Sequence, residues 1–463
     1  MTDSGASPKA VAAMTEPSRA EIVALDRAHL WHPFTQMQEW LATDPLVIAA
    51  ADGNYLLDTD GRRYLDGVSS LWCNVHGHRH PAIDAAIRAQ LDRVAHTTLL
   101  GLASPPAAML AARLTAIAPS GLTRTFYSDA GATAVEIALK LALQYWRLRG
   151  EERPSFVALV EAYHGDTLGA MSVGFSETFH RFYQPLLPVE RVPAPYALER
   201  SERRAPDDAL AAALATLEKT LRRTHGTIAA VVVEPLMQGA AGMWPQPVEY
   251  LREVRALTRR YDTLLVCDEV ATGFGRTGRL FACDHSATTP DLLVLGKGLT
   301  GGYLPLAATL ATEEIFQAFL GPYDGYTAFF HGHTFTGNAL ACAAALASLD
   351  LFTPTLLASL PEKSAALAGA LETRVRPLAP VWEIRQRGLM VGIELMRDPE
   401  RRERYAPGER VGHRVILAAR RRGVVLRPLG DVLVLMPPLS ITTDEIETLV
   451  AVAAESIEEV IGR

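Results

Sequence analysis

The chain has 463 residues, 49% of them hydrophobic and 21% charged, the balance of a globular protein long enough for a large domain and a smaller one. Its formal net charge of −7 gives no reason to expect nucleic acid or an anionic membrane as a partner. The opening stretch lacks the apolar core of a signal peptide, and apolar runs such as 228–233 are far too short to span a bilayer.

The cysteines are Cys73, Cys267, Cys283 and Cys342, which lie far apart and form no C-x-x-C pair. This spacing is typical of reduced thiols and argues against a disulfide framework. We therefore expect a cytoplasmic protein.

The domain organisation is predicted from changes in composition along the chain. Residues 1–20 are small and polar and are expected to form a flexible tail, and residues 21–75 an N-terminal segment that packs with the small domain. A large domain is expected over residues 76–345, and a smaller C-terminal α+β domain over residues 346–463.

Between about residues 122 and 310, short apolar runs alternate with amphipathic helical windows. The runs are β-branched and leucine-rich without polar alternation, which predicts strands covered on both faces. They span residues 125–128, 156–160, 228–234, 264–268 and 292–296. With helices such as 133–148 and 248–261 between them, they predict an α/β fold whose mostly parallel sheet is wrapped by helices. Polar loops are expected at 199–208 and 397–410.

The first predicted strand is followed by a turn of small residues that opens a helix. Gly131, Ala132 and Thr133 would present free backbone N–H groups there, and the helix dipole would add positive potential. This is a candidate phosphate site. The alternative is an ordinary helix cap by Ser128 or Asp129, so the turn is a weak signal by itself.

Asp268 ends the predicted strand 264–268, directly after apolar residues. Burying this carboxylate costs several kcal/mol unless a cation meets it. A protonated pyridine nitrogen would meet it, and the ring would then serve as an electron sink. The alternatives are a salt bridge to an arginine and a helix-capping role.

Lys297 is unusual among the lysines of the chain. Only five of the 45 basic residues are lysine, and Lys297 alone follows an apolar run. Flanked by Gly296 and Gly298, its amine is expected to have a lowered pKa and to suit Schiff-base formation. The alternative is a lysine that snorkels to solvent. Ligands gather at the carboxyl ends of strands in such sheets, so we expect the turn, the carboxylate and the lysine to meet.

At these residues the chain resembles a known family. The segment LLVCDEVATGFGRTGRLFACDHSATTPDLLVLGKGLTGG resembles the signature of class III aminotransferases of fold type I. The segments HLWHPFTQM, SSLWCNVHGH, ALQYW, YHGDT, EPLMQGAAGM, FHGHTFTGNALAC and LRPLGDVLVLMPPL resemble its biotin-pathway branch. The resemblance runs from about Asp26 to the C-terminus.

The resemblance implies pyridoxal 5′-phosphate as cofactor and the transamination of 8-amino-7-oxononanoate to 7,8-diaminononanoate. The implied amino donor is S-adenosylmethionine; the alternatives are the same reaction with L-lysine, or another class III ω-aminotransferase. It further implies that Lys297 forms the Schiff base, that Asp268 pairs with the ring nitrogen, and that Tyr163 stacks on the ring and borders the substrate. Gly131 and Ala132 would hold the phosphate.

Further roles implied by the resemblance concern the substrate and a second subunit. Thr334, preceded by His333, would reach the phosphate of the other subunit, so the active unit would be a homodimer. Arg427 would grip the substrate carboxylate with its guanidinium fork. Trp72 would line the apolar channel, and Gly332 would let the backbone approach the substrate. The alternatives are a core or capping role for Tyr163, a surface ion pair for Arg427 and simple packing for Trp72.

The chain departs from the family pattern at several positions. Ala130-Gly131-Ala132 replaces the usual Ser-Gly-Ser turn, so backbone groups must hold the phosphate. His333 replaces a proline. Phe34 replaces a tyrosine and Leu71 a tryptophan, and both positions are expected to contact substrate and to bear on the choice of donor.

A metal site is the competing interpretation of one histidine cluster. His76, His78 and His80 alternate and would line one face of a strand. Gly77 and Pro81 indicate a turn instead, and no nearby carboxylate or cysteine cluster completes a shell, so no metal is expected.

Two other kinds of protein are rivals to the aminotransferase. An aminomutase or racemase would keep the cofactor but act within one molecule, and a binding protein on this fold would not catalyse at all. The motifs around Arg427 argue against the first rival, and intact Lys297 and Asp268 argue against the second.

Overall fold

The computed structural model of the protein describes residues 17–462. Residues 1–16 of the expected tail lie outside the described residues. Within the described part, Ser18 caps helix α1 (Arg19–His29) in a capping box with Glu21, so the last residues of the expected tail are helical.

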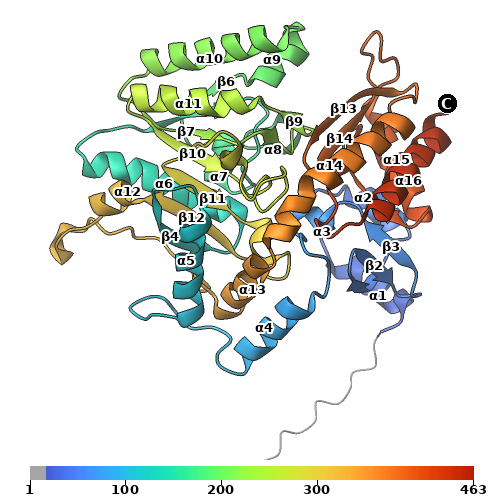
Figure 1. Cartoon of the computed structure of the whole chain (residues 1–463), viewed down its shortest axis with the longest axis horizontal. Helices are drawn as coiled ribbons and strands as arrows, with labels where there is room; N and C mark the ends of the chain where they lie inside the picture. Colours follow the sequence, from blue (N-terminus) through green and yellow to red (C-terminus); the bar gives the residue numbers. More distant parts are fainter. Residues whose placement is uncertain (1–16, 463) are drawn as a thin grey trace, which may run out of the picture.

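A seven-stranded sheet forms the centre of the larger part of the molecule, on the left in Figure 1, with strand order β4-β12-β11-β10-β7-β5-β6. Its strands are β4 (Leu122–Ser128), β5 (Ser155–Leu159), β6 (Val189–Val192), β7 (Ile228–Val233), β10 (Leu264–Asp268), β11 (Leu292–Leu295) and β12 (Ala307–Thr312). Only β12 runs antiparallel to its neighbours among these strands. The expected mostly parallel sheet is confirmed.

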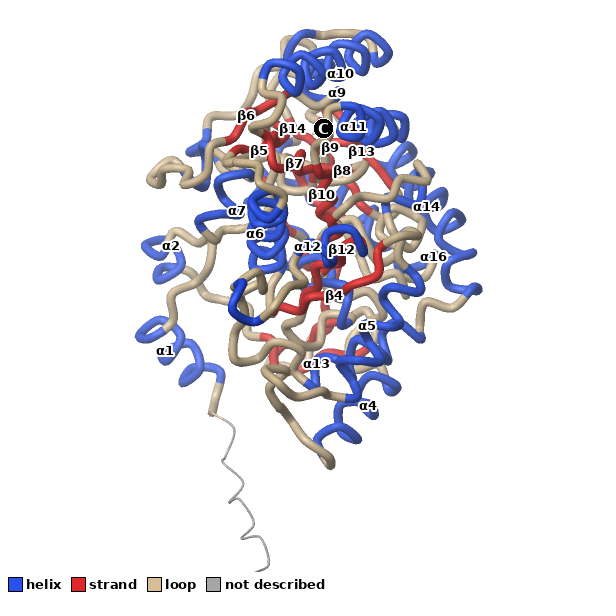
Figure 2. The backbone as a smooth tube through the Cα atoms, turned by 90° about the vertical axis from the view of Figure 1, so that its left-hand side faces the viewer, coloured by secondary structure: helices blue, strands red, loops and turns tan. Residues whose placement is uncertain are grey.

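Alternate residues of each strand enter opposite cores, which is why the strand sequences are apolar throughout. Val231 and Leu265 pack with helices α5 (Pro105–Ile117), α10 (Pro206–Arg223), α11 (Val248–Arg260) and α13 (Ala339–Asp350). Val232 and Leu264 pack on the other face with α6 (Gly131–Leu148), α7 (Leu168–Val173) and α12 (Glu313–Ala318). Figure 2 shows helices on both sides of the strands.

The expected loop at 199–208 is wrong for most of its length. Helix α9 (Pro195–Glu202) and α10 occupy it, and only residues 203–205 connect them. Both helices begin with proline, and Asp207 and Asp208 in the first turn of α10 favour a helix start. The polar residues of this segment therefore belong to the end of one helix and the start of the next.

A second sheet belongs to the C-terminal part of the chain. It has strand order β13-β14-β17-β16, with β13 (Val381–Arg387), β14 (Met390–Leu395), β16 (Arg427–Leu429) and β17 (Val432–Leu435). It shares a core with helices α14 (Pro354–Arg374), α15 (Val411–Arg421) and α16 (Thr443–Ile461). The domain boundary expected after residue 345 falls inside α13.

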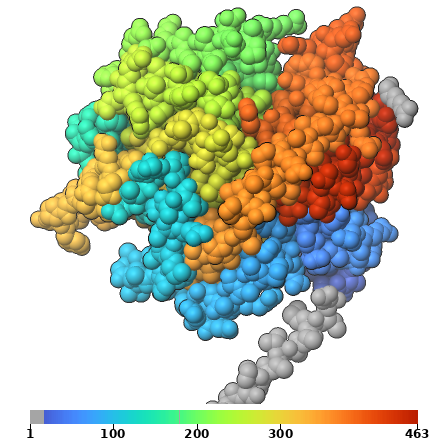
Figure 3. All heavy atoms as spheres, viewed as in Figure 1, coloured from blue at the N-terminus to red at the C-terminus, as the bar shows by residue number. Residues whose placement is uncertain are grey.

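The N-terminal segment packs against this C-terminal part. The strands β1 (Ile48–Asp52), β2 (Tyr55–Asp58) and β3 (Arg63–Asp66) form a sheet with β15 (Val424–Val425). Leu65 pairs with Val424 and contributes to the C-terminal core. In Figure 3 the blue N-terminal segment lies directly against the orange and red C-terminal part.

The remaining elements are short or lie at the edges. They are helices α2 (Met37–Ala42), α3 (Ser69–Trp72), α4 (Pro81–Leu91) and α8 (Glu177–His180), strands β8 (Met237–Gln238) and β9 (Trp244–Pro245), and 3₁₀ turns at Ala282–His285, Lys297–Thr300, Tyr323–Gly325 and Pro407–Glu409. Between residues 17 and 462 no single helix has the length and apolar character needed to cross a membrane; the bent pair α13 and α14, 71° apart, passes that test only when both are counted together.

Candidate active site

The strand ends predicted to carry chemistry lie on neighbouring strands. Asp268, the last residue of β10, pairs in register with Val294 of β11, three residues before Lys297. Strand β4 ends at Ser128, on the far side of β12, and helix α6 starts at Gly131. The structure therefore brings the lysine, the carboxylate and the helix start to one edge of the sheet.

Lys297 begins a short 3₁₀ turn directly after β11, with a left-handed backbone (φ 43°) that a residue with a side chain adopts only under constraint. Burial lowers the pKa of its ammonium below the ordinary value, while the carboxylates of Asp268 and Glu234 oppose this shift. A lowered pKa enlarges the fraction of neutral amine, which is the nucleophilic form.

Asp268 is buried and pairs with a histidine, not with an arginine as one alternative suggested. Its Oδ2 lies 2.7 Å from Nδ1 of His164, and its Oδ1 accepts from the backbone N–H of Val270 at 3.0 Å. Burial opposes the charged form of His164, but the hydrogen bond and charge of Asp268 raise the pKa of His164 above its ordinary value. A carboxylate can accept more than these two hydrogen bonds, so Asp268 can still accept a hydrogen bond from a third donor.

Glu234 is a second buried carboxylate at this edge, directly after β7. It accepts hydrogen bonds from the backbone N–H groups of Tyr163 at 3.1 Å and Gly239 at 3.0 Å. Burial raises its pKa to about 7, with His164 opposing the shift. Its backbone contacts fix the loop that carries Tyr163.

The start of α6 forms a tight cradle of small residues. A Cβ on Gly131 would lie 2.7 Å from Val270 Cγ1, and a Cβ on Gly165 would lie 2.4 Å from the Cβ of Ala132. The N-cap residue is Ala130, which has no polar side chain to cap the helix, and the Thr133 hydroxyl accepts from the backbone N–H of Ala130 at 3.1 Å. Free N–H groups at the start of an 18-residue helix, walled by small residues, fit a phosphate group.

Trp72 lies against the lysine. Its ring centre is 4.7 Å from the Lys297 amine, and the residue is only 6% exposed. It packs with Met237, Met243 and other apolar side chains, and its Nε1 finds no hydrogen-bond partner in the described part of the chain. The neighbouring Leu71 is 46% exposed.

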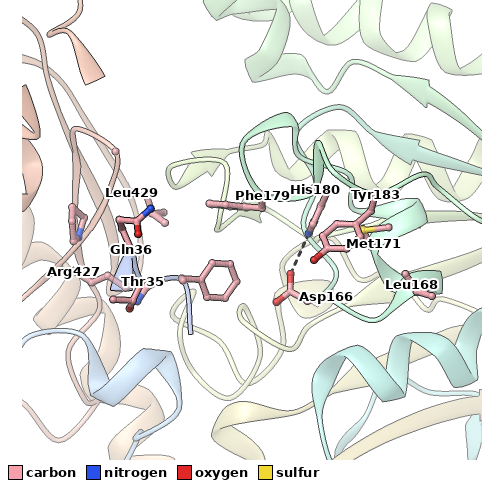
Figure 4. Close-up of a pocket in the computed structure, with 13 residues that line it drawn as sticks. Thr35, Gln36, Asp166, Leu168, Met171, Phe179, His180, Tyr183, Arg427 and Leu429 are labelled. Atoms are coloured by element: carbon pink, nitrogen blue, oxygen red, sulfur yellow. Dashed lines mark hydrogen bonds and ion pairs between the residues drawn. The ribbon is translucent and has the colours of Figure 1, made fainter. Parts of the chain in front are cut away.

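A cavity of about 570 Å³ opens next to Tyr163, whose hydroxyl bonds the lining residue Asp166. Arg427 and Leu429 lie on one side of it and Asp166 and His180 on the other (Figure 4). Arg427 is half-buried, which lowers its pKa, and it has no ion pair with any carboxylate of residues 17–462. Arg427 therefore forms no surface ion pair among the described residues.

Phe34 also lines the cavity, with Arg427 5.9 Å from its ring centre. It is 55% exposed and meets Phe179 edge-on at 5.5 Å. The predicted substrate residues Phe34 and Arg427 therefore come together, although they are far apart in the sequence.

Tyr163 lies between this cavity and the buried carboxylates. Its hydroxyl donates to Asp166 Oδ2 at 2.7 Å, and its ring stacks on His180 at 6.4 Å between centres. Burial, followed by Asp166, raises the pKa of its phenol above the ordinary value, so the hydroxyl stays protonated at neutral pH. His180 bonds the other oxygen of Asp166 at 3.1 Å.

The segment with Gly332, His333 and Thr334 is more exposed than the residues around Lys297. Gly332 and Thr334 are exposed, and the Thr334 carbonyl accepts from His96 Nε2 at 2.8 Å. His333 Nε2 lies 4.0 Å from Asp129 Oδ1, next to the start of α6. Within the single chain these residues border the phosphate cradle without closing it.

Only two of the three alternating histidines are neighbours in the described part of the chain. The rings of His76 and His80 lie 6.4 Å apart, and His76 also packs on Phe352 at 4.6 Å, whereas His78 contacts Asp66 and Asn74. No group of three potential metal ligands occurs in the range 17–462.

Residues 37–457 match the family model Aminotransferase class-III. The curated adenosylmethionine-8-amino-7-oxononanoate aminotransferase of Nitratidesulfovibrio vulgaris is 58% identical over 437 residues, which cover 93% of this chain and 80% of that protein.

The fold is similar to that of solved structures. One is the adenosylmethionine-8-amino-7-oxononanoate aminotransferase of Methanocaldococcus jannaschii, with 42% identity and a TM-score of 0.90, covering 96% of this chain and 100% of that one. Another is a PLP-bound amine transaminase from an uncultivated Pseudomonas species, with 37% identity, a TM-score of 0.89 and coverage of 93% and 99%. The matched family range includes every strand end described above.

Proposed function

The chain belongs to the class III aminotransferases, and from this premise we propose that it transfers an amino group to 8-amino-7-oxononanoate, forming 7,8-diaminononanoate in biotin biosynthesis. The proposed donor is S-adenosylmethionine. The family match confirms the expected enzyme class, fold type and cofactor, pyridoxal 5′-phosphate. The named relative at 58% identity supports the choice of substrate.

The structural observation that carries the substrate proposal is the guanidinium of Arg427, which has no ion-pair partner among residues 17–462. A half-buried cation is costly unless an anion meets it, and the carboxylate of 8-amino-7-oxononanoate would do so. The bidentate fork of arginine suits a carboxylate. The aliphatic chain of the substrate would then lie along the apolar side chains between Arg427 and Lys297.

The residues of the chain divide the chemistry among them. When bound, the cofactor supplies an aldehyde for the amino group and a ring that accepts electrons. We assign Lys297 to bind that aldehyde and, once released, to carry the proton to and from the donor α-carbon. Asp268, fixed by His164, would keep the ring nitrogen protonated. Tyr163 would cover the ring, and the α6 start at Gly131 and Ala132 would hold the phosphate.

The proposal includes a homodimer in the cytoplasm. Gly332, His333 and Thr334 are accessible beside the cradle, so a second copy could contribute Thr334 to the phosphate. Large apolar side chains such as Leu100 and Tyr323 are 90% and 95% exposed, as expected of a surface that another subunit covers.

The amino donor is tested with the PLP-loaded protein and no acceptor. Adding S-adenosylmethionine should bleach the visible absorbance as the cofactor takes up the amino group, and 8-amino-7-oxononanoate should then restore it. Lysine should leave the spectrum unchanged. Bleaching by lysine alone would assign the other donor, and bleaching by simple amines alone would favour an ω-aminotransferase acting on other substrates.

Steady-state double-reciprocal plots should be parallel, because the product of the first substrate leaves before the second substrate binds. Intersecting lines would contradict the mechanism.

Arg427→Ala should raise KM for 8-amino-7-oxononanoate by about 100-fold, the loss of a charge-assisted bidentate contact, and Arg427→Lys should lie between it and the parent. The methyl ester of the substrate serves as the matched probe, because it has no carboxylate and should show little difference between parent and variant. Arg401→Ala, whose side chain is 82% exposed, is the surface control. Equal KM values for acid and ester in the parent enzyme would refute the assigned contact.

A further inference from the structure

The segment that carries Trp72 has an unusual backbone. Ser69, Ser70, Leu71 and Trp72 have φ angles of 50°, 53°, 99° and 68°, all in the left-handed region. None of them is glycine, and residues with a side chain adopt this region only at a cost in conformational energy. A turn of this kind persists only where surrounding groups hold it, so those groups are part of how Trp72 is positioned.

Asp66 holds the turn from its N-terminal side. The residue is fully buried at the end of β3. Its Oδ1 accepts from the backbone N–H of Ser70 at 3.0 Å, and its Oδ2 accepts from the Ser70 hydroxyl at 2.8 Å. Burial opposes ionisation, but His78 and these hydrogen bonds lower the pKa of Asp66 below its ordinary value. The carboxylate is therefore charged at neutral pH.

His78 holds Asp66 from the other side of the turn. Its Nε2 lies 3.0 Å from Asp66 Oδ2, and its Nδ1 lies 2.8 Å from the side-chain amide nitrogen of Asn74. The amide donates to Nδ1, so Nε2 carries the proton that Asp66 accepts. The backbone of His78 is fixed in turn by hydrogen bonds with Gly53.

The opposite side of the turn is also fixed. The buried guanidinium of Arg276 donates to the carbonyls of Trp72 and Asn74 at 3.3 Å each, and the Ser69 hydroxyl donates to the Met436 carbonyl at 2.7 Å. These contacts anchor the two ends of the turn. At its centre the Val68 carbonyl accepts from the backbone N–H of Leu71 at 3.2 Å, and Asp66 is the side chain of the described residues that bonds Ser70.

We infer that Asp66 and His78 are positioning residues for the aminotransferase reaction: their pair holds the 69–72 turn so that the indole of Trp72 stays against the amine of Lys297. The inference rests on the proposed function only for its effect on catalysis. Its structural content, a protected Trp72 that depends on His78, stands independently of the substrate.

The direct test measures how far acrylamide quenches Trp72 in the cofactor-free protein. The fluorescence of Trp72 is obtained by subtracting the emission of the same protein carrying Trp72→Phe. Trp72 should be protected in the parent and in His78→Gln, whose amide nitrogen can still donate to Asp66. It should become accessible in His78→Leu. His225→Leu, at an exposed histidine, is the matched control and should change nothing.

The catalytic test is a double-mutant cycle with the PLP-loaded enzyme. His78→Leu should lower kcat/KM about 30-fold in the parent, but less than about 3-fold in Trp72→Phe, because both changes act through one side chain. If His78→Leu does not fold, Ser70→Ala takes its place in the cycle. It removes one contact to the same carboxylate and should lower kcat/KM about 3-fold.

The outcomes separate the inference from the proposed function. Unchanged quenching of Trp72 in His78→Leu, or additive losses in the cycle, would overturn the positioning role. A parent enzyme that is inactive with every donor, combined with the predicted quenching pattern, would leave the positioning role supported and refute the function.

Discussion

Replacing Lys297 with alanine should lower kcat by at least about 10⁴-fold, or about 5 kcal/mol of transition-state stabilisation. The expected loss is large because Lys297 is assigned both the covalent bond to the cofactor and the transfer of the proton. The variant should also lack the visible absorbance of the Schiff base when mixed with pyridoxal 5′-phosphate. Initial rates and absorption spectra measure the two effects.

Matched lysine variants separate the amine from its charge. Lys297→Arg keeps a cation but offers no primary amine, so it should be as inactive as Lys297→Ala. Lys219→Ala, at an exposed lysine of α10, should retain parental activity. Turnover in Lys297→Ala above a few per cent of the parent would refute the assigned role.

The strand-end residues were predictable because of a simple pattern. Asp268 and Lys297 each follow an apolar run, and neighbouring parallel strands deliver their carboxyl ends to one edge of a sheet. The structure brings both residues together there, and their catalytic roles remain a proposal. Strand β12 was not predicted, since its run of alanine and threonine lacks the bulky residues that mark the other strands.

Two residues beside them were overlooked. Glu234 follows the apolar strand β7 just as Asp268 follows β10, so the same rule would have selected it. His164 stands in the YHGDT motif, but its pairing with Asp268 depends on β5, β7 and β10 being neighbours in space. Strand order is set by the crossover connections, and the sequence of one strand does not contain it.

The backbone turn at residues 69–72 and the unpaired state of Arg427 within residues 17–462 were not predictable, for a related reason. The letters SSLW give no sign of a left-handed turn, because its conformation comes from Asp66 and His78 on one side and Arg276 on the other. Arg427 was selected by resemblance alone; that it has no ion-pair partner among residues 17–462 emerges only once the chain is folded.

Asp268→Asn should lower kcat by about 10³-fold, or about 4 kcal/mol, while changing KM little. Asparagine fills the same volume but carries no charge, so it would no longer keep a proton on the ring nitrogen of the bound cofactor. Asp268→Glu keeps the charge on a longer side chain and should recover part of the activity. A variant Asp268→Asn with parental kcat would contradict the assignment.

The same substitution should also change how stability depends on pH. Asp268 raises the pKa of His164 in the folded protein, so the pair stabilises the fold below the ordinary histidine pKa of about 6.5, and this contribution is lost as pH rises through the higher folded pKa. The difference in unfolding free energy between the parent and Asp268→Asn should therefore be larger near pH 6 than near about pH 9. Urea unfolding of the cofactor-free proteins at both pH values measures it. Because the cofactor is absent, a difference that is constant with pH would mean that His164 carries no charge beside Asp268, and that the carboxylate is held in place by neutral hydrogen bonds alone.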